Sequence, residues 1–150
     1  MRVVIQRVSE ASVVVNQTTV GSIKQGLLIL LGITEGDSSE DINWLCAKLI
    51  GLRIFNDPDG KMNLSIQDVD GSFLVISQFT LYASTKKGNR PSYLQAAKPE
   101  LADPLYQEFT QRLGELSQTK IEKGIFGTDM KVKLINEGPV TITIDSKNKE

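Results

Sequence analysis

The chain has 150 residues, of which 40% are hydrophobic and 23% are charged, and its formal net charge is −1. This size and charge balance are typical of one globular domain and exclude a broad basic surface for long nucleic acids, so any RNA contact must be local. Histidine is absent, which excludes Ser-His and Cys-His catalytic pairs and removes the most common metal ligand.

The single cysteine, Cys46, excludes an internal disulfide and is typical of a protein in the reducing cytoplasm. No apolar run is long enough to span a membrane, and the N-terminal segment lacks the features of a signal peptide. We therefore predict a cytoplasmic protein with no membrane partner. Because histidine and cysteine form no cluster, we also predict that it uses no metal and no cofactor.

The first third of the chain predicts β-strands. Residues 3–8, 11–16 and 19–23 are rich in β-branched side chains, and residues 9–10 separate the first two segments. Residues 26–33 are apolar throughout, as expected of a central strand that is covered on both faces.

The next segment has the spacing of an amphipathic helix. Ser38 or Ser39 is a candidate N-cap, with Asp41 as the capping-box partner, and Gly51 marks the expected end. Four apolar residues share one face of this helix: Ile42, Leu45, Cys46 and Leu49. We therefore expect Cys46 to be a core residue.

The remaining segments complete a domain with more sheet than helix. Residues 53–55 predict a short strand before a proline-containing turn, and a second helix is expected within residues 99–117. Five apolar residues are expected on one face of that helix: Leu101, Leu105, Phe109, Leu113 and Leu116. Two strand-like segments flank a Gly-Pro pair, and a polar tail at 146–150 is expected to be flexible. The pattern predicts a single mixed α/β domain over residues 1–150.

Polar side chains interrupt an apolar run at residues 73–84. If the whole run were a strand, its side chains would alternate. One face would then carry Ser77, Phe79 and Leu81, and the other Gln78, Thr80 and Tyr82. These polar groups lie on a solvated face, satisfy neighbouring backbone, or form the wall of a ligand pocket. A nucleophilic Thr80 or Ser77 would need a lysine or carboxylate base, because histidine is absent.

Two motifs give the chain a specific resemblance. "SQFTLYA" at 77–83 and "NEGPVT" at 136–141 resemble the paired signatures of the D-aminoacyl-tRNA deacylases, S-Q-F-T and N-x-G-P-V-T. Further segments look like family segments in order and spacing, including "IQRVSEASV", "GKMNLS", "GNRPSY" and "FGTDMKVKLIN". Because two signatures about 60 residues apart occur in one short chain, we identify it as a member of that family.

The resemblance implies both a fold and an activity. The implied fold is a barrel-like β/β/α layered domain with mostly antiparallel sheets and two main helices. The implied assembly is a homodimer with its active sites at the interface. The implied activity is hydrolysis of the ester of D-aminoacyl-tRNA, and of mischarged glycyl-tRNA, with the aminoacylated tRNA 3′ end as partner. The chemistry would rely on backbone positioning and the terminal ribose 2′-hydroxyl, although an earlier family view makes the Thr80 position a nucleophile.

The resemblance also implies roles for individual residues. Four residues would form the site that receives the terminal adenosine and the ester carbonyl: Ser77, Gln78, Phe79 and Thr80. A cis Gly138-Pro139 pair would enter the partner's pocket, where its carbonyl oxygens face the substrate's α-amino group and exclude L side chains. Four further residues would support this filter or line the pocket: Arg7, Asn136, Phe126 and Met130. The local charge of the chain, and not the resemblance, suggests that three cations in the loop after the first signature meet tRNA phosphates or are merely solvated: Lys86, Lys87 and Arg90.

Two rival functions remain open from the sequence. The first is a hydrolase of small esters that uses Thr80 or Ser77 and needs no RNA. The second is a non-catalytic RNA-binding dimer, which would bind deacylated tRNA without accelerating ester loss.

Overall fold

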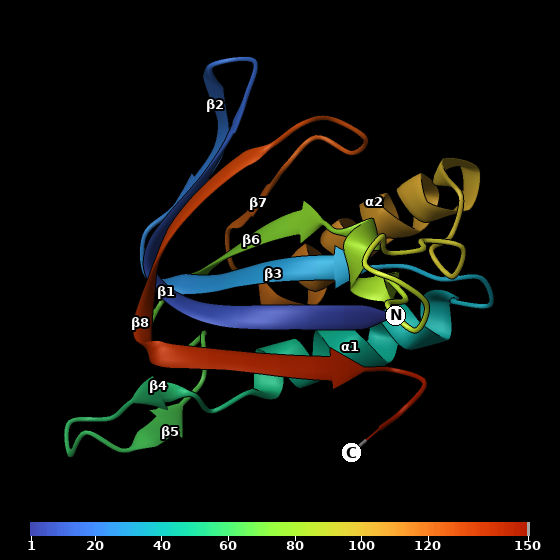
Figure 1. Cartoon of the computed structure of the whole chain (residues 1–150). Helices are drawn as coiled ribbons and strands as arrows, with labels where there is room; N and C mark the ends of the chain where they lie inside the picture. Colours follow the sequence, from blue (N-terminus) through green and yellow to red (C-terminus); the bar gives the residue numbers. More distant parts are fainter. Residues whose placement is uncertain (150) are drawn as a thin grey trace.

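The computed structural model describes residues 1–149 (Figure 1). Its elements follow the chain as β1 (Arg2–Val15), β2 (Thr18–Ile23), β3 (Gly26–Gly32), α1 (Ser39–Gly51), β4 (Phe55–Asn56), β5 (Met62–Leu64), β6 (Ser72–Ser77), the 3-10 helix η1 (Phe79–Tyr82), α2 (Pro99–Ser117), β7 (Ile121–Lys123) and β8 (Lys131–Asp145). The single mixed α/β domain with two main helices is confirmed.

One curved sheet organises the fold. Its strand order is β2-β1-β3-β6-β7, and β8 pairs with β1 along almost its whole length. The β1 pairings are antiparallel, whereas β3-β6 and β6-β7 are parallel. A Cβ atom on Gly21 of β2 would lie 3.0 Å from the carbonyl oxygen of Lys123 in β7, so the two ends of the sheet approach closely. The sheet is therefore a nearly closed, barrel-like layer.

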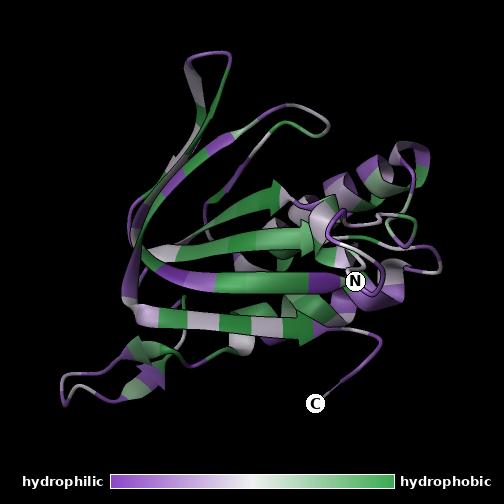
Figure 2. Cartoon of the chain, viewed as in Figure 1, coloured by the Kyte–Doolittle hydropathy of each residue, from purple (hydrophilic) through white to green (hydrophobic). Residues whose placement is uncertain are grey.

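The two faces of the sheet bury separate cores. Both helices cover one face, where the first core includes Leu27 and Ile29 of β3 with Phe73 and Val75 of β6 (Figure 1). The second core lies on the other face and contains Val8, Ala11, Val13, Ile23, Leu28, Leu74 and Ile76. Because alternate side chains point to opposite faces, a strand between two cores must be apolar throughout. Figure 2 shows this continuous hydrophobicity along β3 and β6, whereas β8 is mixed.

The helices confirm most of the sequence predictions. Ser38 is the N-cap of α1 and forms a capping box with Asp41, and Cys46 is fully buried on the apolar face. Helix α2 begins with Pro99 at its first turn. Three of the five expected core positions of α2 are buried: Leu105, Phe109 and Leu113. The other two, Leu101 and Leu116, are exposed, so the predicted stripe was too long. No helix within residues 1–149 has the length and apolarity needed to cross a membrane.

Several strand predictions were wrong in their extent. β1 runs without a break through residues 9–10, and β8 runs through the Gly-Pro pair, because long pairings with register shifts hold both strands together. The expected strand at 53–55 is the shorter β4, and β5 and β7 were missed. The predicted alternation beyond Ser77 was also wrong: the chain leaves the sheet there and turns into η1.

Met1 meets residues 146 and 147 beside α1. The Met1 α-ammonium, which is fully buried, donates to Oδ1 of Asp37 at 2.6 Å and to Oγ of Ser146 at 2.8 Å. Ser146 Oγ donates to Oδ1 of Asp41 at 2.7 Å, and Lys147 Nζ lies 2.8 Å from Oδ2 of the same carboxylate. The tail expected to be flexible thus starts with two anchored residues, and its last position, 150, lies outside the described residues.

Candidate active site

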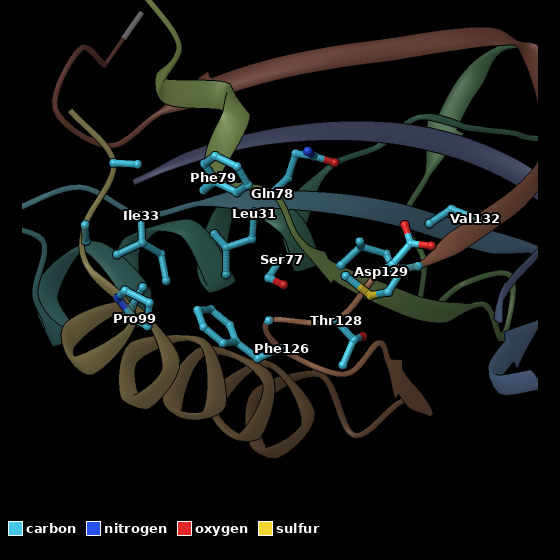
Figure 3. A pocket seen from close by; sticks show the side chains of 16 residues that line it. Leu31, Ile33, Ser77, Gln78, Phe79, Pro99, Phe126, Thr128, Asp129 and Val132 are labelled. Atoms are coloured by element: carbon cyan, nitrogen blue, oxygen red, sulfur yellow. The ribbon is translucent and has the colours of Figure 1, made fainter. Parts of the chain in front are cut away.

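A cavity of about 510 Å³ opens at the carboxyl ends of the parallel strands β3 and β6. Ligands of open α/β sheets commonly bind at such strand ends. Apolar side chains form most of its wall: Leu31, Ile33, Ile76, Ala96, Ala97, Pro99, Ala102, Phe126, Met130 and Val132. Polar side chains come from Ser77, Gln78, Thr128 and Asp129. Figure 3 shows Leu31, Ser77 and Phe126 pointing into this space from three separate parts of the chain.

The floor of this pocket is the segment 77–79. The backbone N–H of Gln78 donates to the carbonyl oxygen of Leu31 at 2.8 Å, which extends the pairing of β6 with β3 by one residue. Beyond it, η1 turns the chain so that Ser77, Gln78 and Phe79 all line the pocket, although a strand would have divided them between two faces.

Thr80 does not line the pocket. Its hydroxyl accepts a hydrogen bond of 2.6 Å from Nε2 of Gln78. Thr80 is thus connected to the floor through an amide side chain. Three of the four residues expected at the reaction centre line the pocket, and the fourth, Thr80, contacts it only through Gln78.

A tight turn after β7 forms the opposite wall. Phe126 and Met130 lie there as expected, and Gly127 adopts a φ of +76° that allows the turn. The Phe126 ring packs on Tyr106 of α2, with 5.9 Å between ring centroids. Burial raises the pKa of the Tyr106 phenol, which donates to the Val75 carbonyl at 2.8 Å. This core anchor therefore fixes the wall against β6.

Two polar wall residues were missed by sequence reasoning. Thr128 donates through Oγ1 to the carbonyl oxygen of Ile125 at 2.8 Å, and the Asp129 carboxylate lies 2.5 Å from Nζ of Lys131. Both lie between Phe126 and Met130 in the family segment "FGTDM". Their place beside Phe126 and Met130 was the one signal in the sequence that pointed to a position in the pocket wall.

The Gly-Pro bend, residues 136–140, lies elsewhere on this chain. Its Gly138-Pro139 peptide is cis, as the resemblance implied, and both residues are exposed. Asn136 holds the two sides together: its Oδ1 accepts from the Val140 N–H at 2.8 Å, and its Nδ2 lies 3.1 Å from Oγ1 of Thr141. Neither member of the Gly-Pro pair lines the pocket formed by residues 77–79 of the same chain.

Arg7 of β1 holds the bend through a hydrogen bond to its backbone. The guanidinium is buried and donates to three carbonyl-type oxygens: Glu137 O at 2.8 Å, Ile54 O at 2.5 Å and Asn56 Oδ1 at 3.2 Å. A Cβ atom on Gly138 would lie 3.0 Å from Nη2 of Arg7 and 2.8 Å from Cγ2 of Val140. Gly138 also has a φ of +144°, so a side chain is disfavoured there for two reasons.

The three expected tRNA-binding cations lie on one exposed loop. Ser84 and Ser92 close this loop through reciprocal backbone hydrogen bonds of 2.8 and 2.9 Å. Lys86, Lys87 and Arg90 lie between them, at the surface beyond η1. None of them takes part in the ion pairs recorded for residues 1–149.

The described site offers positioning groups in place of a catalytic triad. Within residues 1–149, no three His, Cys, Asp or Glu side chains gather in a way that could hold a metal. The pocket combines mostly apolar walls with a few polar side chains on the floor and on the turn opposite it, a combination that suits a flat, partly apolar ligand held by a few directed contacts.

Comparisons with known proteins agree on one family. Residues 4–145 match the family described as D-Tyr-tRNA(Tyr) deacylase. Proteins named D-aminoacyl-tRNA deacylase from Flavobacterium psychrophilum and Bacteroides fragilis are 61% and 59% identical over 150 residues, with 100% of this chain and of each relative covered.

Two solved structures share the fold. One, named c-Myc DNA Unwinding Element Binding Protein, matches with a TM-score of 0.90 and 36% identity, covering 97% of this chain and 98% of that chain. The other, a probable eukaryotic D-amino acid tRNA deacylase, matches with a TM-score of 0.82 at 17% identity over 95% of this chain and 97% of that one. The second likeness supports the fold alone.

Proposed function

The chain belongs to the D-Tyr-tRNA(Tyr) deacylase family, and on this premise we propose that it hydrolyses the ester bond of D-aminoacyl-tRNA in the cytoplasm. Water would cleave the ester between the amino acid and the terminal ribose, releasing free tRNA and a D-amino acid. Relatives about 60% identical over their full length support this activity.

One observation of the site carries the proposal. The first signature, at 77–79, and the turn that holds Phe126 and Met130 face each other across one pocket, although they are far apart in sequence. In this proposal the apolar walls receive the terminal adenosine, and the polar floor receives its ribose and the ester. The small ester rival would not need a pocket of about 510 Å³ beside a loop that carries three cations.

Thr80 acts as a positioning residue in this proposal. Its hydroxyl accepts from the Gln78 amide, which cannot remove a proton, so the contact does not activate a nucleophile. The terminal ribose 2′-hydroxyl and the protein backbone would instead orient the ester for attack by water. This assignment keeps the family's alternative, a nucleophilic Thr80, open to direct test.

The Gly-Pro bend supplies the chiral filter in trans. It is exposed, it is held rigidly by Arg7 and Asn136, and it lies outside the pocket of its own chain. Such a bend has no ligand to face within one subunit, so we propose that it enters the pocket of a second copy. A homodimer would then have two sites, each completed by the partner. L side chains would be rejected by the carbonyl-bearing backbone of Gly138 and Pro139.

The experiment that tests this function compares ester loss from D-tyrosyl-tRNA and L-tyrosyl-tRNA with purified protein. We expect rapid release from the D ester and no acceleration for the L ester. Equal acceleration of both esters would show that the protein has no chiral filter. Binding without acceleration would favour the RNA-binding rival, and a covalent adduct with a serine-reactive ester would favour the small-ester rival.

A further inference from the structure

An exposed pair of aromatic rings lies at the edge of the pocket: Phe79 lines the pocket and Tyr93 contacts Phe79 from outside it. Phe79 and Tyr93 are in edge-to-face contact, with 5.0 Å between ring centroids and 71° between ring planes. The exposed fractions are 57% for Phe79 and 41% for Tyr93. Apolar rings of this size usually become buried on folding, so two that remain exposed together indicate a binding surface.

The backbone holds this aromatic pair in place against the pocket. The Tyr93 carbonyl accepts from the Ala96 N–H at 3.0 Å, and Ala97 N–H donates to the Ile33 carbonyl at 2.9 Å. Ile33, Ala96 and Ala97 are all wall residues, and Phe79 belongs to the floor. The surface of the pair is therefore a continuation of the pocket wall toward solvent.

The segment that joins the two aromatic residues carries three cations. The loop closed by Ser84 and Ser92 lies between Phe79 and Tyr93 in the sequence and carries Lys86, Lys87 and Arg90. Aromatic rings beside a basic surface are the combination with which proteins bind single-stranded nucleic acid, because bases stack on the rings and cations meet the phosphates.

We propose that Tyr93, together with the outer face of Phe79, stacks the unpaired nucleotide that immediately precedes the terminal adenosine, while the loop cations contact its phosphates. This inference rests on the proposed function, which puts the terminal adenosine in the pocket. A strand that leaves the pocket over Phe79 meets Tyr93 next. Tyr93 is thus a substrate-binding residue outside the pocket that holds the ester.

The test separates the terminal nucleoside from the rest of the strand. D-tyrosyl-tRNA and 3′-O-D-tyrosyl-adenosine are hydrolysed in parallel by wild type, Tyr93→Ala and Tyr93→Phe. We expect Tyr93→Ala to raise KM for the tRNA about tenfold, the order of one lost base-stacking contact. KM for tyrosyl-adenosine and kcat for both substrates stay within about twofold in this prediction, and Tyr93→Phe behaves as wild type because it keeps the ring.

A matched control and a binding measurement complete the test. Leu94→Ala removes a neighbouring apolar side chain that is 95% exposed and has no ring, and we expect it to leave KM unchanged. Fluorescence anisotropy with an uncharged CCA trinucleotide should show the same tenfold loss for Tyr93→Ala. Lys86→Ala with Lys87→Ala should make the slope of log Kobs against log[salt] for that binding shallower by about 0.7 per cation removed.

Each outcome has one meaning. An unchanged KM and trinucleotide affinity in Tyr93→Ala would overturn the inference, as would an equal KM increase for tyrosyl-adenosine. If wild-type protein fails to hydrolyse D-tyrosyl-tRNA, the proposed function is wrong. The trinucleotide affinities then still decide whether Tyr93 binds single-stranded RNA.

Discussion

The hydroxyl of Thr80 and the amide of Gln78 form a contact of 2.6 Å behind the pocket floor. Because Thr80 positions Gln78 in the proposed mechanism, we expect Thr80→Ala to keep turnover within about tenfold of wild type, whereas loss of a true nucleophile costs several orders of magnitude more. Single-turnover deacylation of D-tyrosyl-tRNA measures the difference. Loss of all turnover, with circular dichroism and tRNA binding unchanged, would restore the nucleophile assignment.

Individual residues were the most predictable part of the site. Ser77, Gln78 and Phe79 were expected from the first signature, and Phe126 and Met130 from the family segment "FGTDMKVKLIN"; all five line one pocket. Their spatial arrangement was not predictable from alternation, because η1 replaces the expected strand after Ser77. Local pattern cannot show that β6 has lost its pairing partner at that point.

At the scale of an element, the N-terminus of α1 depends on the carboxylate of Asp41. This carboxylate forms the capping box with Ser38 and also contacts Ser146 and Lys147. Burial raises the pKa of Asp41, but hydrogen bonds from Lys147, Ser146 and the Ser38 backbone N–H outweigh this effect and lower it to about 2. A lowered pKa in the folded state means that the ionised carboxylate stabilises the fold above its ordinary pKa of 3.8, and that this contribution is lost as the pH falls toward 2.

We therefore expect Asp41→Asn to reduce the free energy of unfolding at pH 6, and the difference from wild type to shrink between pH 4 and about pH 2. Urea denaturation across this range provides the measurement. Asp59→Asn is the matched control, since Asp59 is an exposed turn residue. A difference that stays constant with pH would show that Asp41 acts through packing and not through its charge.

Long-range pairing explains which elements the sequence did and did not predict. Helices α1 and α2 follow from spacing and caps within a few residues. β7 is only Ile121–Lys123, and it is a strand because Phe73, Leu74 and Val75 of β6 pair with it. The Gly-Pro bend combines both cases: Asn136 holds it through a local hydrogen bond to Val140, whereas Arg7 reaches Glu137 from β1 over 130 residues, which no local window contains.

At the scale of the whole molecule, the Met1 α-ammonium joins the first residue to Asp37 and Ser146. The charged groups of Met1 and Asp37 form an ion pair and are both fully buried. An added Gly-Ser before Met1 removes that charge and leaves Asp37 without its partner. We expect a loss of about 3–5 kcal/mol in the free energy of unfolding, the usual cost of breaking a buried pair.

Urea denaturation of the extended and unextended proteins checks this expectation. A control protein carries the same Gly-Ser extension after residue 150. This extension should change the free energy of unfolding by less than about 0.5 kcal/mol. Equal stability of the N-terminally extended protein would show that the Met1 contacts are dispensable.

Part of the exposed surface of β8 is apolar, as the homodimer that we propose would require. Ile135 is 53% exposed and directly precedes the Gly-Pro bend, so a second copy that receives the bend would cover it. We expect light scattering at micromolar concentration to give the mass of a dimer. Ile135→Asp should weaken the dimer and the activity together, whereas Met62→Asp, at an exposed residue of the β4–β5 hairpin, should change neither. A monomer with full activity would refute a site shared between subunits.

The proposed chiral filter predicts which substrates the protein accepts. Backbone carbonyls that exclude an L side chain cannot exclude glycine, which has none, so we expect glycyl-tRNA to be hydrolysed as well as D-tyrosyl-tRNA. A valine side chain at Gly138 would meet Val140 and Arg7 and would require a disfavoured φ of +144°. Gly138→Val should therefore lower activity on both substrates without creating activity on L-tyrosyl-tRNA, because the occluding backbone remains.

Ester half-lives of the D-tyrosyl, L-tyrosyl and glycyl forms measure this with wild type, Gly138→Val and Gly51→Val. Gly51 is a control because a Cβ atom there has no neighbour within 4 Å. If Gly138→Val gained activity on the L ester, the bend would act through flexibility and not through exclusion. If wild type spared glycyl-tRNA, a contact with the D side chain would be required for turnover, and selection would depend on recognising that side chain in addition to rejecting the L form.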